Sequence, residues 1–348
     1  MGHDARAQAC SAWLEAEGWS TTTLDSMRLL GPRGGSAGKA VFRAMLAVPG
    51  VYDAFHFAAL RTGSRLTDLA DSAARRQILP RLQAYLDAEP AALVISVYAT
   101  GASAVSSLAG RYPDLRHVVF CTDVTPHRLW VHPNVDLYLV TSPVAERAVR
   151  RFEPRARVVV VPPPIRSVFY DPPAQQDARL SLGVPADERC VLLMSGAWGL
   201  GPLAAAAEAL AAAGVHVLAV AGTNERLERR LAAAAVRQAR IRSFGFTDRI
   251  PKLMSAADLV ITSSGDTCAE ARAIGRPLLL LDVVAGHGRD NLQHELELGD
   301  AAVTSARPAD VVRSALAALD DVKPAGPPAS TAAAWESAFG TALAGIGL

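Results

Sequence analysis

The first side chain that could accept a proton lies near the start of the chain, at His3, and Asp4 follows it directly. Because the unperturbed pKa of histidine lies near neutral pH, an imidazole can take a proton from a hydroxyl group. Asp4 could serve as the base instead, or could orient the imidazole. The alternative is that His3 has no chemical role and is simply disordered beside a chain terminus.

Two glycine-bearing segments each follow an apolar stretch and precede a helical one. Glycine lets the backbone approach a phosphate, and a helix N-terminus supplies free amides and the positive end of a dipole. Either segment alone is equally well explained as an ordinary strand–helix turn, but the two together favour phosphate binding. The residues concerned are Gly196, Gly199 and Gly201 in the first segment and Ser264, Gly265 and Thr267 in the second.

Two charged residues accompany these turns. Glu270 follows the second turn, and a carboxylate there can accept two hydrogen bonds from a pair of hydroxyls. Its alternative role is that of an acidic residue favoured by the helix dipole. Arg166 follows a run of three prolines, and arginine is well suited to a bidentate grip on phosphate. The alternative for Arg166 is a surface residue of the hinge.

A second polar cluster follows the apolar stretch His117–Cys121. It contains Asp123, His127, Trp130 and His132. Ligands bind at the carboxyl ends of parallel strands, so this position favours a site. Two histidines and an aspartate could suggest a metal, but their irregular spacing in a proline-bearing loop favours none. Asp123 could support the base or the acceptor, and a loop-capping role is as plausible.

The elements that must position these residues alternate along the chain. Short apolar runs predict strands that are covered on both faces, as in a parallel sheet flanked by helices. Helices are predicted between them, as at 203–213, 224–236 and 308–319, and this alternation indicates an α/β fold with doubly wound sheets. The predicted strands are 92–97, 117–121, 137–141, 157–161, 191–195, 215–221, 258–262 and 277–282.

The best domain boundary is the proline run at 162–164, which can continue neither a helix nor the interior of a strand. We therefore expect two Rossmann-like domains, 1–162 and 163–330, facing a central cleft. The tail 331–348 is predicted to be a helix that packs across the domain junction, or within an ordinary core.

The first domain has an unusual start. A Rossmann-like domain normally opens with an apolar strand, but here an amphipathic helix with Ala7, Cys10, Trp13 and Leu14 on one face follows the first residues directly. The first strand of the N-domain is therefore expected to be missing from this sequence, and the true start is expected to lie upstream of Met1.

Composition narrows the class of protein. The chain has 348 residues, 50% of them hydrophobic, with 35 Lys and Arg against 34 Asp and Glu. This balance argues against a general nucleic-acid binder. The four cysteines are scattered through apolar stretches, which favours buried thiols in a reducing cytosol. No secretion signal or membrane span is recognised, so a cytoplasmic or peripheral protein is expected.

The motifs, taken in order, resemble the monogalactosyldiacylglycerol synthase family, and more distantly the N-acetylglucosaminyltransferase that completes the peptidoglycan lipid precursor. The resemblance covers roughly residues 1–320 and implies a GT-B fold, inversion and no catalytic metal or cofactor. It rests on the motifs Gly2-His3, Thr122-Asp123, Pro164-Ile165-Arg166, Gly196–Leu203, Gly222–Leu227, Gly245–Asp248, Ser264–Thr267 with Glu270, and Gly286–Gly288 with Asn291.

This resemblance implies a role for each site residue. His3 is the base that faces the cleft, the turn at Ser264 and Gly265 cradles the nucleotide diphosphate, and Glu270 holds the ribose. Phe246, which follows the strand into Gly245, meets the uracil, and Arg166 neutralises the departing diphosphate. The remaining residues implied in donor binding are Asn224, Gly286, His287, Gly288 and Asn291.

Two departures from the family affect specificity. His287 and Gly288 replace the usual amide and acid side chains, which leaves the sugar undefined. The segment 96–101 stands where the family has a His-Pro pair, which weakens diacylglycerol as the acceptor. The apolar, aromatic stretch 41–57 resembles the family's acceptor mouth, so lipid or membrane contact through residues 41–60 is expected, with core packing as an equal alternative.

We therefore expect a glycosyltransferase that moves a sugar from a UDP-sugar to a hydroxyl of a lipid or lipophilic acceptor. One alternative is a sugar-nucleotide 2-epimerase of the same fold. The other is a nucleotide-sugar-binding protein without catalysis.

Overall fold

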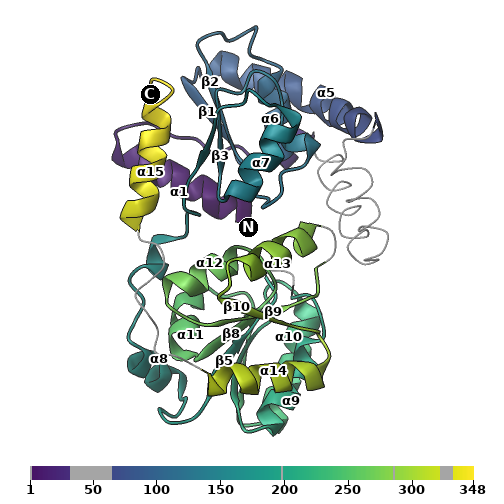
Figure 1. Ribbon diagram of the computed structural model, residues 1–348, viewed down its shortest axis with the longest axis vertical. Helices are drawn as coiled ribbons and strands as arrows, with labels where there is room; N and C mark the ends of the chain where they lie inside the picture. The colour runs from purple at the N-terminus through teal and green to yellow at the C-terminus, as the bar shows by residue number, and fades with distance from the viewer. Residues whose placement is uncertain (1, 32–64, 197–198, 285–286, 322–331) are drawn as a thin grey trace. The chain divides into compact units, whose positions relative to one another are not determined.

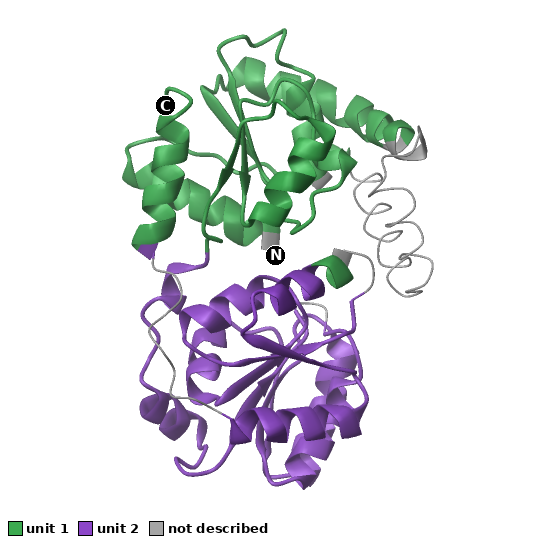
Figure 2. Ribbon diagram, viewed as in Figure 1, with its two compact units in different colours: residues 1–164, 285–290, 333–348 green, residues 165–284, 291–332 purple. Residues whose placement is uncertain are grey.

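A computed structural model of the chain describes residues 2–31, 65–196, 199–284, 287–321 and 332–348. These residues form two compact units, each built around a parallel sheet (Figure 1). Unit 1 comprises residues 1–164, 285–290 and 333–348, and unit 2 comprises 165–284 and 291–332 (Figure 2). The predicted α/β class with two Rossmann-like folds is confirmed. The predicted acceptor segment at 41–60 lies outside the described residues.

The sheet of unit 1 has the order β1-β2-β3-β4, all parallel. Its strands are β1 (Leu93–Ser96), β2 (Arg116–Phe120), β3 (Leu137–Val140) and β4 (Val158–Val160). Its helices are α1 (Gly2–Ala16), α2 (Ser26–Leu29), α5 (Arg65–Ala88), α6 (Ala99–Ser106), α7 (Pro143–Phe152) and α15 (Ala332–Ala344), with the short 3-10 turn η2 (Arg128–Trp130).

Both faces of this sheet are covered, which explains why most residues of its strands are apolar. On one face, Phe120 of β2 stacks against Trp335 of α15, and α1 packs beside them through Cys10 and Leu14. On the other face, β2 and β3 pack against α6, η2 and α7. The predicted C-terminal helix is thus present as α15, and its apolar residues belong to the core of unit 1.

The sheet of unit 2 has six parallel strands in the order β10-β9-β8-β5-β6-β7. The strands are β5 (Cys190–Leu193), β6 (His216–Val220), β7 (Ile241–Phe244), β8 (Leu259–Thr262), β9 (Leu278–Leu281) and β10 (Ala301–Thr304). The helices are α8 (Gln175–Leu182), α9 (Leu203–Ala212), α10 (Glu225–Arg237), α11 (Ile250–Ala256), α12 (Asp266–Ala273), α13 (His287–Glu297) and α14 (Pro308–Asp320), with the 3-10 turn η3 (Ser167–Phe169).

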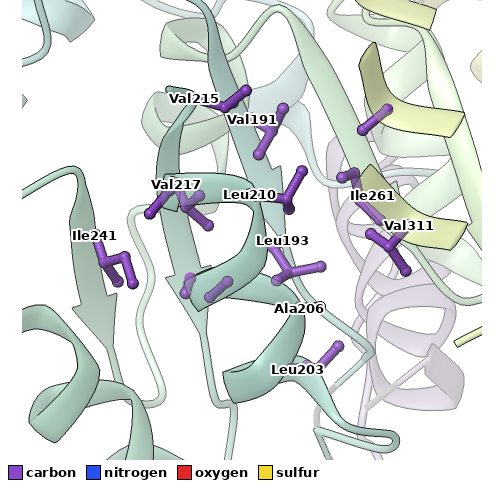
Figure 3. Close-up of a cluster of buried hydrophobic side chains, with 14 of the residues drawn as sticks. Val191, Leu193, Leu203, Ala206, Leu210, Val215, Val217, Ile241, Ile261 and Val311 are labelled. Atoms are coloured by element: carbon purple, nitrogen blue, oxygen red, sulfur yellow. The ribbon is translucent and has the colours of Figure 1, made fainter. Parts of the chain in front are cut away.

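Alternate residues of β5 enter two separate cores. Val191 and Leu193 pack against α9 and α14 in the cluster shown in Figure 3. Cys190, Leu192 and Met194 face α8, α11 and α12 on the other side of the sheet. The eight strands predicted from apolar runs are all present, to within two residues at either end. Strand β10 at one edge was not among them.

No helix in the described part of the chain is long and apolar enough to cross a lipid bilayer.

Candidate functional site

The strand order of unit 2 defines where a ligand can bind. From β5 the chain steps to β6 and β7 on one side, and then returns to β8, β9 and β10 on the other. The order therefore reverses between β5 and β8. In open α/β sheets, ligands bind outside the carboxyl ends of the strands at such a reversal. The two predicted glycine turns follow β5 and β8 and so flank this point.

The turn after β5 requires glycine for steric reasons. Gly196 and Gly199 have φ angles of 57° and 54°, which favour glycine. A Cβ on Gly199 would lie 2.5 Å from the carbonyl oxygen of Ala221, whereas a Cβ on Gly196 would meet no atom of the described residues within 4 Å. Gly201 completes the turn and is exposed. The backbone at Gly196 therefore adjoins open space that a ligand could occupy.

Asn224 holds this turn in place. Its Oδ1 accepts a hydrogen bond from the Leu227 amide at 3.0 Å and so caps α10. Its Nδ2 donates to the carbonyl oxygen of Gly199 at 3.2 Å. The structure thus gives Asn224 a positioning role, and its predicted contact with the donor stays a prediction.

The turn after β8 leads into α12. Gly265 precedes the helix, and within the described part of the chain nothing lies within 4 Å of where its Cβ would be. Ser264 and Thr267 are partly exposed beside it. Glu270 lies one turn further along α12. The residue predicted to bind the ribose is therefore separated by about one helical turn from the residues predicted to bind the diphosphate.

Arg166 and Glu270 form an ion pair although they are 104 residues apart in sequence. The Arg166 Nη2 atom donates to the Glu270 Oε1 atom at 3.2 Å. The guanidinium also lies over the Phe169 ring, 4.8 Å from its centroid. The Glu270 side chain is 12% exposed, and burial raises the pKa of this carboxyl to about 7 against the opposing charge of Arg166. The structure therefore brings together two residues that were predicted separately.

A hollow of about 450 Å³ lies in unit 2 between the segments that follow Arg166 and Phe246. Its lining includes Ser167 and Val168 from the first segment and Asp248 from the second. The Phe246 ring itself is 71% exposed after β7. An aromatic face left in solvent is available for stacking against a planar ligand.

The predicted sugar-binding residues lie on or next to α13. Asn291 is partly buried, and its Oδ1 atom is buried without a hydrogen-bond partner in the described structure. Gly288 is buried in the first turn of the helix. Gly286 and the side chain of His287 lie outside what is described, so their predicted roles stay predictions.

In unit 1, His3 lies where β1 and β2 end. Its Nδ1 atom is 2.9 Å from the carbonyl oxygen of Val97 and 3.0 Å from the Thr122 hydroxyl. Because a carbonyl can only accept, Nδ1 carries the proton and Nε2 keeps its lone pair. The Tyr98 ring packs edge-on against the imidazole, with centroids 4.8 Å apart. Burial lowers the pKa of His3 below its ordinary value, and the charge of Asp123 opposes this.

Asp123 is held by its neighbours within the same loop. The indole nitrogen of the buried Trp130 donates to Asp123 Oδ2 at 2.9 Å, and His127 Nε2 lies 3.5 Å from the same oxygen. His132 is turned elsewhere, since its Nε2 contacts the Leu129 carbonyl oxygen at 2.7 Å. The predicted pair His3 and Asp123 thus shares one site, whereas His132 does not belong to it.

Three contacts to His3 were not assigned from the sequence: the Val97 carbonyl, the Thr122 hydroxyl and the Tyr98 ring. Their position directly after two strands was the available signal. Within the described ranges, no group of three or more His, Cys, Asp or Glu side chains is placed to hold a metal ion.

Comparison with known proteins gives two family matches. Residues 3–165 match the monogalactosyldiacylglycerol (MGDG) synthase family, and residues 197–306 match the C-terminal domain of glycosyltransferase family 28. Together the two matches span both units.

Two curated relatives show the same likeness. Monogalactosyldiacylglycerol synthase 1, chloroplastic, from Arabidopsis thaliana is 31% identical over 202 residues, which cover 53% of this chain and 38% of that protein. A processive diacylglycerol beta-glucosyltransferase from Bacillus pumilus is 30% identical over 205 residues, covering 58% and 53%. The matched part thus spans less than two thirds of either relative.

Solved structures support the fold. Sucrose-phosphate synthase from Thermosynechococcus elongatus has a TM-score of 0.52 at 18% identity, covering 79% of this chain and 75% of that one. A UDP-N-acetylglucosamine 2-epimerase has a TM-score of 0.56 at 14% identity, covering 80% and 78%. At these identities the likeness shows the GT-B fold alone, since that fold hosts more than one chemistry.

Proposed function

Because this chain belongs to the monogalactosyldiacylglycerol synthase-like family of GT-B glycosyltransferases, we propose that it transfers a sugar from a UDP-linked donor to a hydroxyl group of a lipid or lipophilic acceptor. The observation that carries this proposal is the Arg166–Glu270 pair beside the two glycine turns of unit 2. Arg166 provides a cation for the phosphates, and Glu270 provides a carboxylate for hydroxyl groups. The glycine turns provide backbone that a ligand can approach, at the point where the strand order reverses.

The donor would be held by unit 2. Backbone amides at Gly265 and at the start of α12 meet the diphosphate, and Glu270 accepts hydrogen bonds from the ribose hydroxyls. Arg166 then exchanges its contact with Glu270 for one with the phosphate. The open space over Gly196 and Gly265 supports close approach of the ligand to the backbone.

The acceptor would be activated by His3. With the Nδ1 proton directed to Val97, the Nε2 lone pair takes the proton from the acceptor hydroxyl. The hydroxyl oxygen attacks the anomeric carbon in the same step, and the bond from that carbon to the phosphate oxygen breaks. One displacement inverts the anomeric centre, and UDP carries away the electron pair.

The leaving diphosphate would be stabilised without a catalytic metal or cofactor. Arg166 and the backbone amides of the glycine turns provide positive charge and hydrogen bonds where negative charge develops. Activity that persists in EDTA is the expected result, and loss of activity restored by Mg²⁺ would contradict this part of the proposal.

The acceptor class comes from two curated relatives, whose names state synthesis of monogalactosyldiacylglycerol and glucosylation of diacylglycerol. We propose a diacylglycerol or another lipophilic alcohol, met at the cytoplasmic face of a membrane. Tyr98 beside His3 is a bulky neighbour for the acceptor hydroxyl, so the acceptor's shape near that hydroxyl is expected to be restricted.

A product assay tests the function directly. Purified protein is incubated with UDP-galactose, UDP-glucose or UDP-N-acetylglucosamine and diacylglycerol vesicles, and UDP, lipid and free nucleotide sugar are analysed by mass spectrometry. UDP release with a glycosylated lipid supports transfer. An altered free UDP-sugar would indicate the 2-epimerase, and tight UDP binding without any turnover would indicate a binding protein.

The base is tested by His3→Ala in the same assay. Loss of the general base is expected to lower kcat at least ~100-fold. UDP affinity is expected to stay unchanged, because His3 belongs to unit 1. Near-normal turnover in this variant would remove His3 from the mechanism.

A further inference from the structure

The first helix of unit 1 carries a buried cation close to the proposed base. Arg6 is 7% exposed and lies three residues after His3 on α1, so the two side chains lie on the same side of the helix. Guanidinium groups are almost never buried to this degree unless a specific partner compensates for the lost water. The groups that Arg6 contacts therefore indicate its purpose.

Arg6 is bound to the end of β2. Its Nη1 atom donates a hydrogen bond to the carbonyl oxygen of Cys121 at 3.2 Å, and its guanidinium lies 5.7 Å from the centroid of the Phe120 ring. Cys121 is 1% exposed, and its amide donates to the Leu139 carbonyl oxygen at 2.9 Å. The contact thus joins α1 to the residue at which β2 passes into its loop.

The peptide that Arg6 holds leads directly to a contact of His3. Cys121 contributes the carbonyl group to the peptide bond with Thr122, and the Thr122 hydroxyl lies 3.0 Å from Nδ1 of His3. The contacts therefore form a closed circuit, from Arg6 to Cys121, along the chain to Thr122, and back to His3 on the same helix. A shift of the Cys121 carbonyl would displace Thr122, which orients the imidazole together with the Val97 carbonyl.

The charge of Arg6 also acts on the protonation of His3. Burial lowers the pKa of His3, the charge of Asp123 raises it, and the positive charges of Arg6 and the terminal amino group lower it. Tyr98, whose ring contacts the imidazole, stays uncharged, because burial raises its pKa. Arg6 thus favours the neutral imidazole, which is the form that can accept a proton.

We propose that Arg6 is a positioning residue for the base, and that it holds the Cys121–Thr122 peptide so that Val97 and Thr122 keep the imidazole of His3 oriented. This inference rests on the proposed function and goes beyond it, because it assigns a role to a residue that acts only through His3. Rotation of the ring would move the Nε2 lone pair away from the acceptor hydroxyl, and general-base catalysis depends on that geometry.

The test compares Arg6→Met with Arg6→Lys in the transfer assay. Methionine fills much of the same space but provides neither a charge nor an N–H donor. In Arg6→Met, kcat is expected to fall about tenfold, because a charge-assisted hydrogen bond that orients the base is lost. The KM for the UDP-sugar is expected to stay unchanged, because the residues proposed to hold the diphosphate and ribose belong to unit 2.

The pH profile of kcat/KM separates this role from a purely structural one. The acid-side pKa is expected to rise in Arg6→Met, because the cation that lowers the pKa of His3 is gone. Arg6→Lys keeps a positive charge and an N–H donor, so its acid-side pKa is expected to match the wild type and its kcat to recover in large part.

Ser103→Ala is the matched control for loss of stability. Ser103 is 1% exposed in the same unit, and its Oγ donates to Oδ2 of Asp71 at 2.7 Å. Loss of this buried hydrogen bond is expected to lower Tm, while kcat and the acid-side pKa stay at their wild-type values. If Arg6→Met does not fold, Arg6→Gln replaces it, since the amide can donate but carries no charge, and its acid-side pKa is expected to rise as well.

Nitrogen NMR of labelled histidine in the ligand-free protein gives a readout that needs no turnover, and His3→Ala identifies the His3 signal. The wild type is expected to carry the His3 proton on Nδ1, and Arg6→Met to show a mixture of the two tautomers. Unchanged kcat, acid-side pKa and tautomer in Arg6→Met, or a loss of kcat that Ser103→Ala reproduces, would overturn the inference. A wild-type protein that transfers no sugar to any acceptor would overturn the proposed function instead, and the tautomer comparison distinguishes the two failures because it does not depend on transfer.

Discussion

Burial and charge oppose each other at two residues, His3 and Glu270. Burial disfavours the charged form of each, so it lowers the pKa of the histidine and raises that of the carboxyl. Asp123 counteracts the effect at His3, and Arg166 counteracts it at Glu270. These opposing effects lead to one prediction for His3 and two for Glu270.

Asp123→Asn is expected to shift the acid side of the pH profile of kcat/KM to lower pH. Asp123 raises the pKa of His3, so removing its charge lowers that pKa further. The asparagine can still accept the Trp130 hydrogen bond, which keeps the loop in place. The measurement is kcat/KM against pH, with a shift of up to about one unit expected.

Asp136→Asn serves as the control for this shift. Asp136 pairs with Arg116 and accepts from the His117 amide in the same unit, whereas His3 contacts Val97, Thr122 and Tyr98. Its loss is expected to leave the acid limb where it is. If the acid-side pKa of the kcat/KM profile rises in Asp123→Asn, or does not change, the proposed electrostatic role of Asp123 is contradicted.

Glu270→Gln is expected to reduce the pH dependence of UDP binding. With a pKa of about 7, Glu270 is roughly 10% ionised at pH 6 and roughly 90% at pH 8. The affinity of the wild-type protein for UDP is therefore expected to rise about tenfold between pH 6 and pH 8, because the ionised carboxylate binds the ribose. Calorimetry at several pH values measures this affinity. UDP titrates as well, so the relevant quantity is the difference between the two proteins, and equal slopes would refute the prediction.

The same carboxyl affects stability with a definite sign. Its pKa is raised in the folded state, so its stabilising contribution is present below the ordinary carboxyl range and is lost as pH rises through about 7. The free energy of unfolding of the wild type is therefore expected to fall relative to Glu270→Gln between pH 5 and pH 8. Urea denaturation at both pH values checks this.

At the scale of elements, the turn after β5 contains one glycine that is required by close packing and one that borders open space. Gly199 lies against the Ala221 carbonyl and is held by Asn224, so it is part of the scaffold. Gly196 has a similar φ angle, but no neighbour among the described residues lies where its Cβ would be. The two glycines therefore serve different purposes within one turn.

Gly199→Ala and Gly196→Ala separate these purposes. Gly199→Ala adds a clash to backbone strain, so it is expected to destabilise the protein by roughly 3 kcal/mol. Gly196→Ala is expected to cost only about 1 kcal/mol, from the positive φ. Because its methyl enters the open space, it is expected to weaken UDP binding about tenfold, and normal UDP affinity in this variant would show that the donor does not approach Gly196. Denaturation and calorimetry measure the two effects.

For the molecule as a whole, the last helix, α15, packs in unit 1 rather than in unit 2, which precedes it in the sequence. Trp335 and Phe339 of α15 stack with each other, with centroids 4.7 Å apart, and Phe339 meets Trp13 of α1 edge-on at 5.1 Å. The core of unit 1 is therefore closed by residues from both ends of the described chain, whereas unit 2 has its own two cores.

Phe339→Ala is expected to destabilise unit 1 by about 3–5 kcal/mol, since Phe339 is fully buried. UDP affinity is expected to stay unchanged, because the residues proposed to hold the diphosphate and ribose belong to unit 2. Hydrogen exchange resolved along the chain measures the stability of each unit. Leu210→Ala, in the core shown in Figure 3, is the counterpart and should loosen unit 2 instead, and a loss of UDP affinity in Phe339→Ala would contradict separate roles for the units.

The sequence by itself determined the strands, the fold class and the glycine turns, because these depend on local patterns. A strand covered on both faces is mostly apolar, as in β5 and β8. Glycine at a strand's end leaves the backbone room to approach a ligand. Strand β10 was not predicted, because its run Ala-Ala-Val-Thr is short and contains only one large apolar residue, and two of its four residues are exposed.

Only the tertiary structure decided which distant residues meet. Arg166 and Glu270 are 104 residues apart, and the His3 imidazole finds its partner at Val97, so no local pattern could pair them. The contact between Arg6 and the Cys121 carbonyl is likewise a property of packing, since it joins two residues that are 115 positions apart. The pattern of apolar residues in the sequence determines which face of an element is buried. The contacts between elements depend on how those faces pack, and the protonation of His3 and Glu270 depends on these contacts.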